Sequence, residues 1–165
     1  WLGLALVSLS ASALSEIDPD WKESVAPPAP SFNKDQVIPI EMPRYVSLRF
    51  GVDPATLVIT PDGIVRYVLV VRTAGGATNV SFEGINCKER TWKHYATGRS
   101  DRSWVKSHAP RIEWRPIENK PINRHHAALS RDLFCPAGNA INTAEEGRNA
   151  LRLGQHPNSV SRISY

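Results

Sequence analysis

The sequence predicts an α+β protein: mainly an antiparallel β-sheet (a meander of hairpins), with a short helix before Cys135 and a C-terminal helix packed on the sheet. Residues 57–83 form the longest patterned apolar block and are divided by two groups of turn residues. Strand-like segments continue after Cys87, and residues 143–154 carry helix start and stop signals. At 165 residues, the chain is long enough for one domain with a single core.

Residues 1–15, WLGLALVSLSASALS, predict a secretory signal peptide. They carry no charge and end in small residues, as the apolar core and cleavage region of such a signal do. No basic start precedes them, so we expect the signal to be truncated. The alternative is a short buried helix, because about 14 apolar residues are too few to span a bilayer. We therefore expect a periplasmic protein without a transmembrane segment, and membrane association stays an open alternative.

Residues 16–43 are expected to form an extended, proline-rich lead-in to a domain at 44–154. Pro39 and Pro43 interrupt the apolar stretch VIPIEMPRY and restrict it to an edge strand or a draped segment. Four side chains are available to dock it on the core: Phe32, Ile38, Ile40 and Tyr45. Asp53-Pro54 is expected to start a turn before a short strand at 57–60. Residues 155–165 are expected to be a tail.

The central hairpins are predicted most clearly. Pro61-Asp62-Gly63 and Gly75-Gly76 have the composition of tight turns, with glycine accepting a positive φ. Between them, residues 64–73 are expected to be a strand, and residues 78–83 the strand that returns. One face of the middle strand carries Val65, Tyr67, Leu69 and Val71, and the other carries Arg66, Val68, Val70 and Arg72. Because both faces are apolar in the middle, this strand should be covered on both sides.

Basic residues are concentrated in the second half of the chain. Residues 1–86 contain 6 Lys/Arg and 9 Asp/Glu, whereas residues 87–165 contain 14 and 7. This asymmetry favours a basic face for an anionic partner, although a solvated surface has the same composition. Within this half, NRHHAALSRDLFC predicts a short helix with Asn123 as its N-cap. Residues 143–154 predict a second helix, capped by Thr143 and ended by Gly154.

The chain has two cysteines, Cys87 and Cys135. An exported protein meets an oxidising compartment, so a disulfide between them is the favoured interpretation. Two buried free thiols are the alternative. Two cysteines without clustered histidines do not make a zinc site, and no metal or cofactor is expected.

Three blocks of the sequence resemble the CNP-one-like family: GIVRYVLVVRTAGGATNVSFEGINCKERTWKHYATGRSDRSW, NRHHAAL and DLFCPAG. The resemblance extends over residues 32–154 and includes both cysteines. This is a family of small, signal-peptide-bearing proteins of Gram-negative bacteria, so the resemblance implies an envelope location. The resemblance implies no activity and no catalytic residue, because none is established for the family. Some relatives carry a lipid-attachment cysteine after the signal, and its absence here implies a soluble periplasmic form.

Arg66 and Arg72 are candidate ligand-binding residues at the two ends of the middle strand. A buried arginine is costly unless it is paired, so partners such as Glu83 or Asp62 are expected inside the protein. Alternatively, the two guanidinium groups present hydrogen-bond donors to a carboxylate or phosphate.

A basic segment with three tryptophans is the second candidate binding surface. Trp92, Trp104 and Trp114 lie among cations, and the candidate ligand-binding residues here are Arg90, Trp92, Lys93 and Arg115. Aromatic rings with cations suit single-stranded nucleic acid, but export argues against that partner and favours an anionic envelope component or a partner protein. The alternative is that the tryptophans belong to the core. The leading hypothesis is a non-enzymatic envelope accessory or binding protein that uses this face.

Arg124 and His125 are the last candidates, for an anion-binding or catalytic pocket. The adjacent His125 and His126 point about 100° apart on a helix and cannot easily share one metal ion. The alternative is that one histidine makes a structural hydrogen bond and the other is solvated. The sequence offers no GxSxG motif and no nucleophile beside a base. A hydrolase-like enzyme with a pocket around Arg124 and His125 is therefore the alternative function, and no catalytic residue is assigned.

Overall fold

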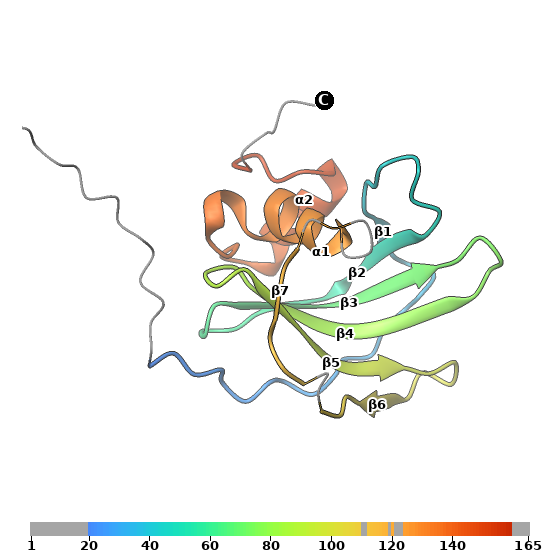
Figure 1. Ribbon diagram of the computed structural model, residues 1–165, viewed down its shortest axis with the longest axis horizontal. Coiled ribbons are helices and arrows are strands. Elements are labelled where there is room, and N and C mark those ends of the chain that lie inside the picture. Colours follow the sequence, from blue (N-terminus) through green and yellow to red (C-terminus); the bar gives the residue numbers. More distant parts are fainter. Residues whose placement is uncertain (1–19, 110–111, 119, 121–123, 160–165) are drawn as a thin grey trace, which may run out of the picture.

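A computed structural model describes residues 20–109, 112–118, 120 and 124–159, which form one antiparallel sheet covered by helices (Figure 1). The strand order is β1-β2-β3-β4-β5-β6, and β7 pairs with the start of β5. The strands are β1 (Ile38–Pro39), β2 (Arg49–Ile59), β3 (Ile64–Arg72), β4 (Thr78–Asn86), β5 (Thr91–Gly98), β6 (Trp104–Lys106) and β7 (Arg115–Pro116). The predicted α+β class, with a meander of hairpins, is confirmed.

The helices lie together on one face of the sheet (Figure 1). They are α1 (Arg124–Ala128), the π-helix η2 (Leu129–Phe134), the 3₁₀ turn η3 (Pro136–Gly138) and α2 (Ala144–Leu153). The helix predicted before Cys135 is therefore present, as α1 continued by η2. Its predicted cap, Asn123, and the predicted signal peptide lie outside the described residues. None of the helices within those residues is long and apolar enough to cross a membrane.

The middle strand, β3, is covered on both faces as predicted. Val65, Tyr67 and Leu69 are buried beneath the helices, beside Leu129 and Phe134. On the opposite face, Val68 and Val70 pack against Phe82 and against Phe32 of the lead-in. The lead-in thus supplies the second cover of the sheet, and Figure 1 shows it, in blue, crossing on the side away from the helices.

The turns of the central hairpins have the expected chemistry. Gly63 and Gly76 both adopt the left-handed conformation, with φ of 81° and 86°. In each turn the glycine N–H donates to a threonine carbonyl, that of Thr60 at 2.9 Å and that of Thr73 at 3.0 Å. Positive φ at these positions is readily available only to glycine, which explains why the turns occur here.

Asp53-Pro54 does not start a turn, and this prediction was wrong. Both residues lie within β2, where the pairing with β3 shifts register between Asp53 and Val58. The Asp53 side chain is buried and accepts hydrogen bonds from the N–H groups of Ala55 (3.1 Å) and Asn33 (2.7 Å). These bonds stabilise a bulge, so the chain stays in the sheet and residues 57–59 are the end of a long strand.

The Cys87–Cys135 disulfide is present, with the two Cα atoms 5.4 Å apart. Cys87 directly follows β4 and Cys135 directly follows η2. The bridge therefore ties the helical layer to the end of the central hairpin, as the favoured interpretation of the two cysteines predicted.

Docking on the core is confirmed for three of the four named side chains and wrong for Tyr45. Phe32 and Ile40 are buried, Ile38 is partly buried, and Tyr45 is 66% exposed. Pairing of β1 with β2 confirms the edge strand. At the other terminus, residues 155–159 pack back on the helices: the His156 N–H donates to the Asp132 carbonyl at 2.7 Å.

The C-terminal helix α2 begins and ends as predicted. The Thr143 hydroxyl accepts from the N–H of Glu146 at 3.1 Å, and Gly154 ends the helix in the left-handed conformation. Between them, Gly147 faces the core, where an added Cβ would lie 2.3 Å from Leu57 Cδ2 and 2.6 Å from Ile141 Cδ1. Gly147 therefore sets how closely the helix approaches the sheet.

Gly147→Ala should consequently destabilise the protein, although alanine favours a helix. The helical preference of alanine stabilises by roughly 1 kcal/mol, whereas forcing a methyl group into a packed core costs roughly 1–3 kcal/mol. We expect a net loss of about 1 kcal/mol in the free energy of unfolding, measured by urea denaturation. Asn149→Ala, an exposed-face substitution on the same helix, is the control, and an equal or larger loss there would contradict close packing at Gly147.

Candidate functional site

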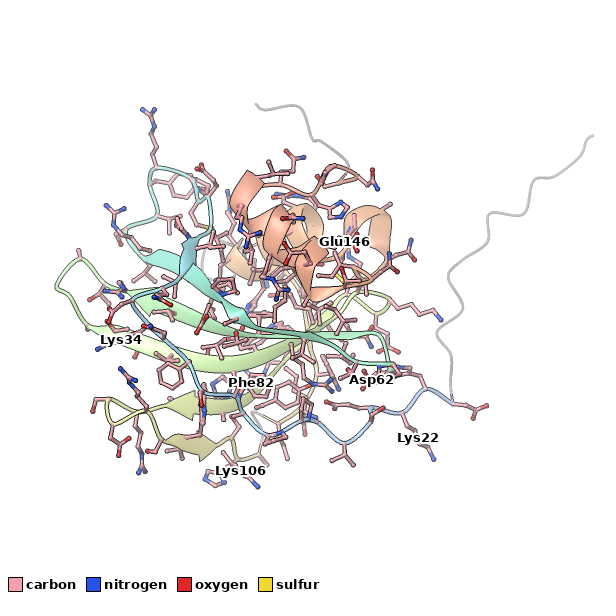
Figure 2. All side chains as sticks on the ribbon, turned by 180° about the vertical axis from the view of Figure 1, so that it is seen from behind. Lys22, Lys34, Asp62, Phe82, Lys106 and Glu146 are labelled. Carbon is pink, nitrogen blue, oxygen red and sulfur yellow. A yellow bond between two sulfur atoms is a disulfide. The ribbon has the colours of Figure 1, made fainter. Side chains whose placement is uncertain are left out.

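Residues 21–32, here called the strap, cross the face of the sheet opposite the helices (Figure 2). At its far end, Phe32 is buried and its ring lies 4.9 Å from that of Trp104 in an edge-on contact. At its near end, the Trp21 indole N–H donates to the Asp62 carbonyl at 3.1 Å, and the Ser24 N–H donates to the Asp62 carboxylate at 3.0 Å. Both ends of the strap are therefore fixed to the sheet.

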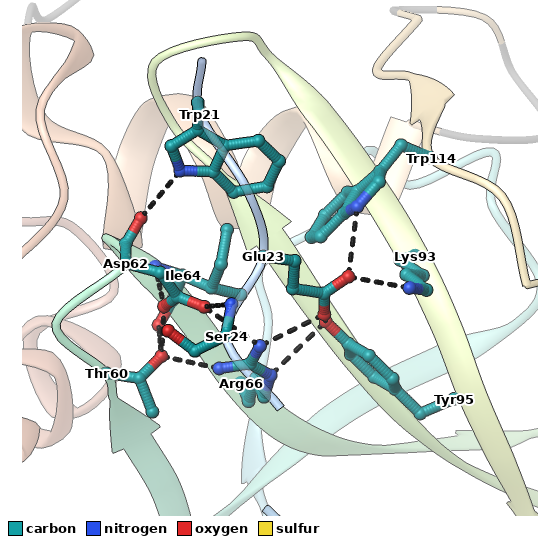
Figure 3. A network of polar contacts seen from close by, with 10 residues as sticks. All are labelled: Trp21, Glu23, Ser24, Thr60, Asp62, Ile64, Arg66, Lys93, Tyr95 and Trp114. Atoms are coloured by element: carbon teal, nitrogen blue, oxygen red, sulfur yellow. Dashed lines mark hydrogen bonds and ion pairs between the residues drawn. The ribbon is translucent and has the colours of Figure 1, made fainter. Parts of the chain in front are cut away.

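Glu23 is the centre of a polar network that holds the strap (Figure 3). Its carboxylate accepts from four groups: Arg66 Nη2 at 3.0 Å, Lys93 Nζ at 2.6 Å, Tyr95 Oη at 2.5 Å and Trp114 Nε1 at 3.2 Å. Burial acts to raise the pKa of Glu23, but the hydrogen bonds from Lys93, Tyr95 and Arg66 outweigh it and hold that pKa below its ordinary value. Glu23 is therefore an ionised acceptor that joins the strap to β3 and β5.

The Arg66 side chain is fully buried, with 0% exposure, and is held by protein groups. Besides Glu23, it lies 3.4 Å from the Asp62 carboxylate and donates through Nε to the Tyr95 hydroxyl at 3.2 Å. Pairing inside the protein and the predicted partner Asp62 are confirmed. The other named partner, Glu83, was wrong because it lies on the helix-covered face, where it bonds His126.

The Tyr95 ring fits into this network because the adjacent strand β4 carries a glycine, Gly84, beside it. Arg66 pairs with Gly84 across β3 and β4. A Cβ on Gly84 would lie 2.9 Å from Tyr95 Cε2 and 3.0 Å from its hydroxyl oxygen. The glycine therefore allows the phenol to reach Glu23 and Arg66, and burial with the Glu23 bond raises the pKa of Tyr95, so it remains a neutral donor.

A pocket of about 820 Å³ opens between the strap and the strands β5 and β6. Its lining includes an aromatic group from three strands, Phe82, Tyr95 and Trp104, and a small apolar wall from the strap at 26–29. The Trp104 indole donates to the Pro30 carbonyl at 2.9 Å, which fixes the ring beside the strap. We call this the strap pocket; its size is that of an ordinary small-molecule site.

Three charged residues line the strap pocket: the carboxylate of Glu23 and the amines of Lys93 and Lys106. Lys93 is 19% exposed and bonded to Glu23, while Lys106 is exposed on β6. Figure 2 shows Lys106 and Phe82 on the side of the sheet opposite Glu146 of α2. His94 also lines the pocket, and its Nδ1 lies within hydrogen-bonding distance of the Ser107 hydroxyl. The pocket therefore combines an aromatic, apolar surface with cationic and polar groups at one wall.

A second polar cluster lies beneath the helices. Glu83 Oε2 is 2.8 Å from His126 Nε2 and accepts from the Tyr67 hydroxyl at 3.2 Å, while Oε1 accepts from Ser81 at 2.8 Å. The His126 ring stacks on Trp92, with centroids 3.8 Å apart. Burial acts to raise the pKa of Glu83, but the charge and hydrogen bond of His126 hold it below its ordinary value. The rings of Trp92 and His125 both pack against His126 in this cluster.

Arg124 and His125 lie next to this cluster. His125 stacks on Phe50, with ring centroids 4.4 Å apart and planes 14° apart. Burial, together with the charge of His126, lowers the pKa of His125 to about 4. The Arg124 guanidinium lies 5.5 Å from the centre of the Tyr45 ring. Neither residue lines the strap pocket.

The other residues singled out in the sequence are dispersed. Arg72 pairs with Asp35 at 3.3 Å near the end of β3, and Arg90 is exposed in the turn between β4 and β5. Arg115 lies over the Trp92 ring, 5.7 Å from its centre, on the helix side of the sheet.

Of the three tryptophans, Trp104 alone lines the strap pocket, whereas Trp114 bonds Glu23. The structure therefore brings together Arg66 and Lys93, but does not form one continuous basic, tryptophan-bearing face from these residues.

Sequence reasoning missed three residues of the site: Glu23, Tyr95 and Lys106. Glu23 lies in the proline-rich lead-in, 43 residues before Arg66, and no periodicity connects the two. One signal was present: a buried arginine on an apolar strand requires a carboxylate, and the lead-in supplies Glu23. Among the described residues, no three His, Cys, Asp or Glu side chains gather as a metal site.

The fold and the site define a disulfide-linked α+β protein with a ligand-sized pocket beneath an N-terminal strap. The chain belongs to the CNP1-like family, whose model matches residues 16–152. It is 30% identical over 141 residues to Cryptic neisserial protein 1 of Neisseria gonorrhoeae, a match that covers 72% of this chain. The same match covers 66% of that relative, just under two thirds of its length. No solved structure matches the chain.

Proposed function

We propose that this protein is a non-enzymatic binding protein of the cell envelope, and that the strap pocket holds its ligand. The observation that carries the proposal is the combination, in one pocket of about 820 Å³, of the aromatic rings of Phe82, Tyr95 and Trp104 with the exposed amine of Lys106, beside the Lys93–Glu23 ion pair. Such a site suits a small ligand with an apolar or aromatic body and an acidic group. Aromatic rings supply contact area, and Lys106 supplies charge complementarity.

An envelope location is part of the proposal and is supported by the sequence. Residues 1–15 have the composition of a signal peptide, and a Cys87–Cys135 disulfide suits an oxidising compartment such as the periplasm. The ligand would then be an anionic envelope component, or an acidic segment of a partner protein. Membrane association remains compatible with such a ligand.

A hydrolase-like enzyme around Arg124 and His125 has less support. His125 is packed between Phe50 and His126, and it does not line the strap pocket. A general base needs access to a substrate proton, and ring packing against Phe50 and His126 restricts that access at His125. We therefore assign binding, rather than catalysis, to the protein.

Binding of anilinonaphthalene sulfonate tests the proposal, because this probe joins an aromatic body to an acidic group. We expect saturable fluorescence enhancement with the native protein and weaker binding at high salt, since the lysine contribution is screened. Lys106→Glu should weaken the affinity about tenfold, equivalent to about 1.4 kcal/mol. Fluorescence titration at two salt concentrations measures both effects.

Lys88→Glu is the matched control, because Lys88 is exposed, lies in the turn between β4 and β5, and carries the same charge change. Its affinity for the probe should stay within about twofold of the unmodified protein. Equal losses in Lys106→Glu and Lys88→Glu would mean that net charge alone governs binding. No saturable binding at all would contradict a ligand site beneath the strap.

A further inference from the structure

Three cationic side chains converge on a second, smaller pocket at the end of the sheet. This pocket of about 290 Å³ lies where the turns of the β3–β4 and β5–β6 hairpins meet the lead-in, and we call it the hairpin-tip pocket. Lys34, Arg99 and Arg102 line it, together with the hydroxyl residues Thr78 and Ser100. No carboxylate lines it, and it shares no lining residue with the strap pocket. Three positively charged residues and no negatively charged one therefore line the pocket.

The cationic side chains of the hairpin-tip pocket are exposed, and hydrogen bonds from Ser103 together with the charge of Arg99 lower the pKa of the neighbouring Asp101. Within the described part of the chain, no hydrogen bond or ion pair engages the cationic groups of Lys34, Arg99 or Arg102. The two nearest acidic residues in sequence are engaged elsewhere. Asp101 accepts from the Ser103 N–H at 2.9 Å and from its hydroxyl at 2.6 Å, and Asp35 pairs with Arg72. The donors of all three cations are available to a ligand.

The loop that carries Lys34 is held in place by other residues. Arg72 Nη2 donates to the Lys34 carbonyl at 2.5 Å, and the neighbouring Asn33 N–H donates to the buried Asp53 carboxylate at 2.7 Å. Phe32, one residue earlier, is buried against Trp104. Arg72, a candidate ligand-binding residue from the sequence, therefore acts as a positioning residue for this loop. A preorganised loop lowers the entropic cost of binding a small ligand.

Arg102 occupies a backbone conformation that usually belongs to glycine. Its φ is 70°, and its N–H closes the turn by donating to the Arg99 carbonyl at 2.9 Å. Glycine is favoured at such a position after a hairpin turn, because side chains are strained there. The chain thus keeps an arginine where glycine would be more stable, and strained backbone of this kind is concentrated at functional sites.

From this arrangement we infer that the hairpin-tip pocket binds an oxyanion of the phosphoryl or sulfate type, coordinated by Lys34, Arg99 and Arg102. Arginine donates to two oxygens of such a group at once, and lysine and hydroxyl groups complete the coordination. The oxyanion can belong to a soluble phosphate or to a lipid headgroup. The site goes beyond the proposed function, because it is separate from the strap pocket and takes a compact anion.

Arg102→Gly tests this inference. The substitution relieves the backbone strain at this position and also removes a side chain that coordinates the oxyanion. The full folded chain is titrated with inorganic phosphate at constant ionic strength, following the backbone amide signals of Gly76, Gly98 and Ser100 by NMR. We expect saturable shifts of these signals in the unmodified protein. Arg102→Gly should raise the thermal denaturation temperature and weaken phosphate binding at least tenfold. A merely structural role for the Arg102 side chain predicts the opposite change in denaturation temperature.

Arg90→Gly is the matched control. Arg90 also has a positive φ, 55°, and is exposed, but it lies at the opposite end of β5, which spans eight residues or roughly 25 Å. The Arg90→Gly variant should gain as much thermal stability as Arg102→Gly. Its affinity for phosphate should stay within about twofold of that of the unmodified protein. Equal weakening in both variants, or unsaturable shifts that follow only ionic strength, would overturn the inference.

Vesicles distinguish the two sources of the oxyanion. Cosedimentation with phosphatidylglycerol vesicles, but not with phosphatidylcholine vesicles, that is competed by phosphate and lost in Arg102→Gly supports a lipid headgroup. Phosphate binding without vesicle retention supports a soluble phosphate. Vesicle retention that persists in Arg102→Gly, together with the absence of saturable phosphate binding, would overturn the site.

Discussion

Glu23→Ala should lower the free energy of unfolding by about 3 kcal/mol, because it leaves a buried arginine without its main partner. Arg66 is fully buried, and its remaining carboxylate contact, with Asp62, is the longer one at 3.4 Å. The Tyr95 hydroxyl and the Trp114 indole would also lose their acceptor. Urea denaturation measures the loss, and amide hydrogen exchange should show early opening of the strap.

Two further variants separate this effect from a general loss of charge. Glu23→Gln keeps an acceptor oxygen and should be destabilised less than Glu23→Ala, since some hydrogen bonds survive. Glu41→Ala removes an exposed carboxylate beyond β1 and should change stability by less than about 0.5 kcal/mol. If Glu23→Ala and Glu41→Ala were equally stable, the network around Glu23 would not hold the strap.

Stability should fall by about 2 kcal/mol between pH 7 and pH 5, because His125 is partly buried and is held in its neutral form. Its pKa is about 4 in the folded protein, against an ordinary value of 6.5. Between these values the unfolded chain takes up a proton that the folded protein does not, so each step toward acid favours unfolding. Below that range, protonation of Glu83, whose pKa is also lowered, removes further stability as the pH falls through it.

His125→Phe isolates this contribution. The new ring can keep the stacking on Phe50, while the titrating group is removed. The difference in unfolding free energy between pH 7 and pH 5 should become smaller by about 2 kcal/mol. His108→Gln, at an exposed position, should leave the difference unchanged. An identical pH dependence in His125→Phe and the unmodified protein would mean that His125 is not the group responsible.

The sheet and the C-terminal helix were predictable because their signals are local. Gly63 and Gly76 mark turns by their own conformational freedom, and the alternating faces of β3 follow from period-two patterning. Thr143 and Gly154 mark the ends of α2 in the same local way. Each of these features depends on a few neighbouring residues, so the sequence contains it directly.

The bulge in β2 and the site were not predictable in this way. The dipeptide Asp53-Pro54 is typical of a turn, but the Asn33 N–H, 20 residues away, bonds the Asp53 carboxylate and helps keep the chain in the sheet. The partner of Arg66 in the lead-in depends on the strap crossing the sheet, which no pattern in the proline-rich segment specifies. Likewise, the facing of Trp92 and Trp104 to opposite sides depends on the bulge between β4 and β5 and on tertiary packing.

The indole N–H signals of the tryptophans provide the most direct test of a ligand site beneath the strap. Trp104 lines the strap pocket, whereas Trp92 lies on the other face against His126 and serves as an internal control. In an NMR titration with anilinonaphthalene sulfonate, the Trp104 indole signal should shift saturably, and the Trp92 signal should not move. A saturable shift of Trp92 with Trp104 unchanged would place binding on the helix side of the sheet and contradict the proposed function.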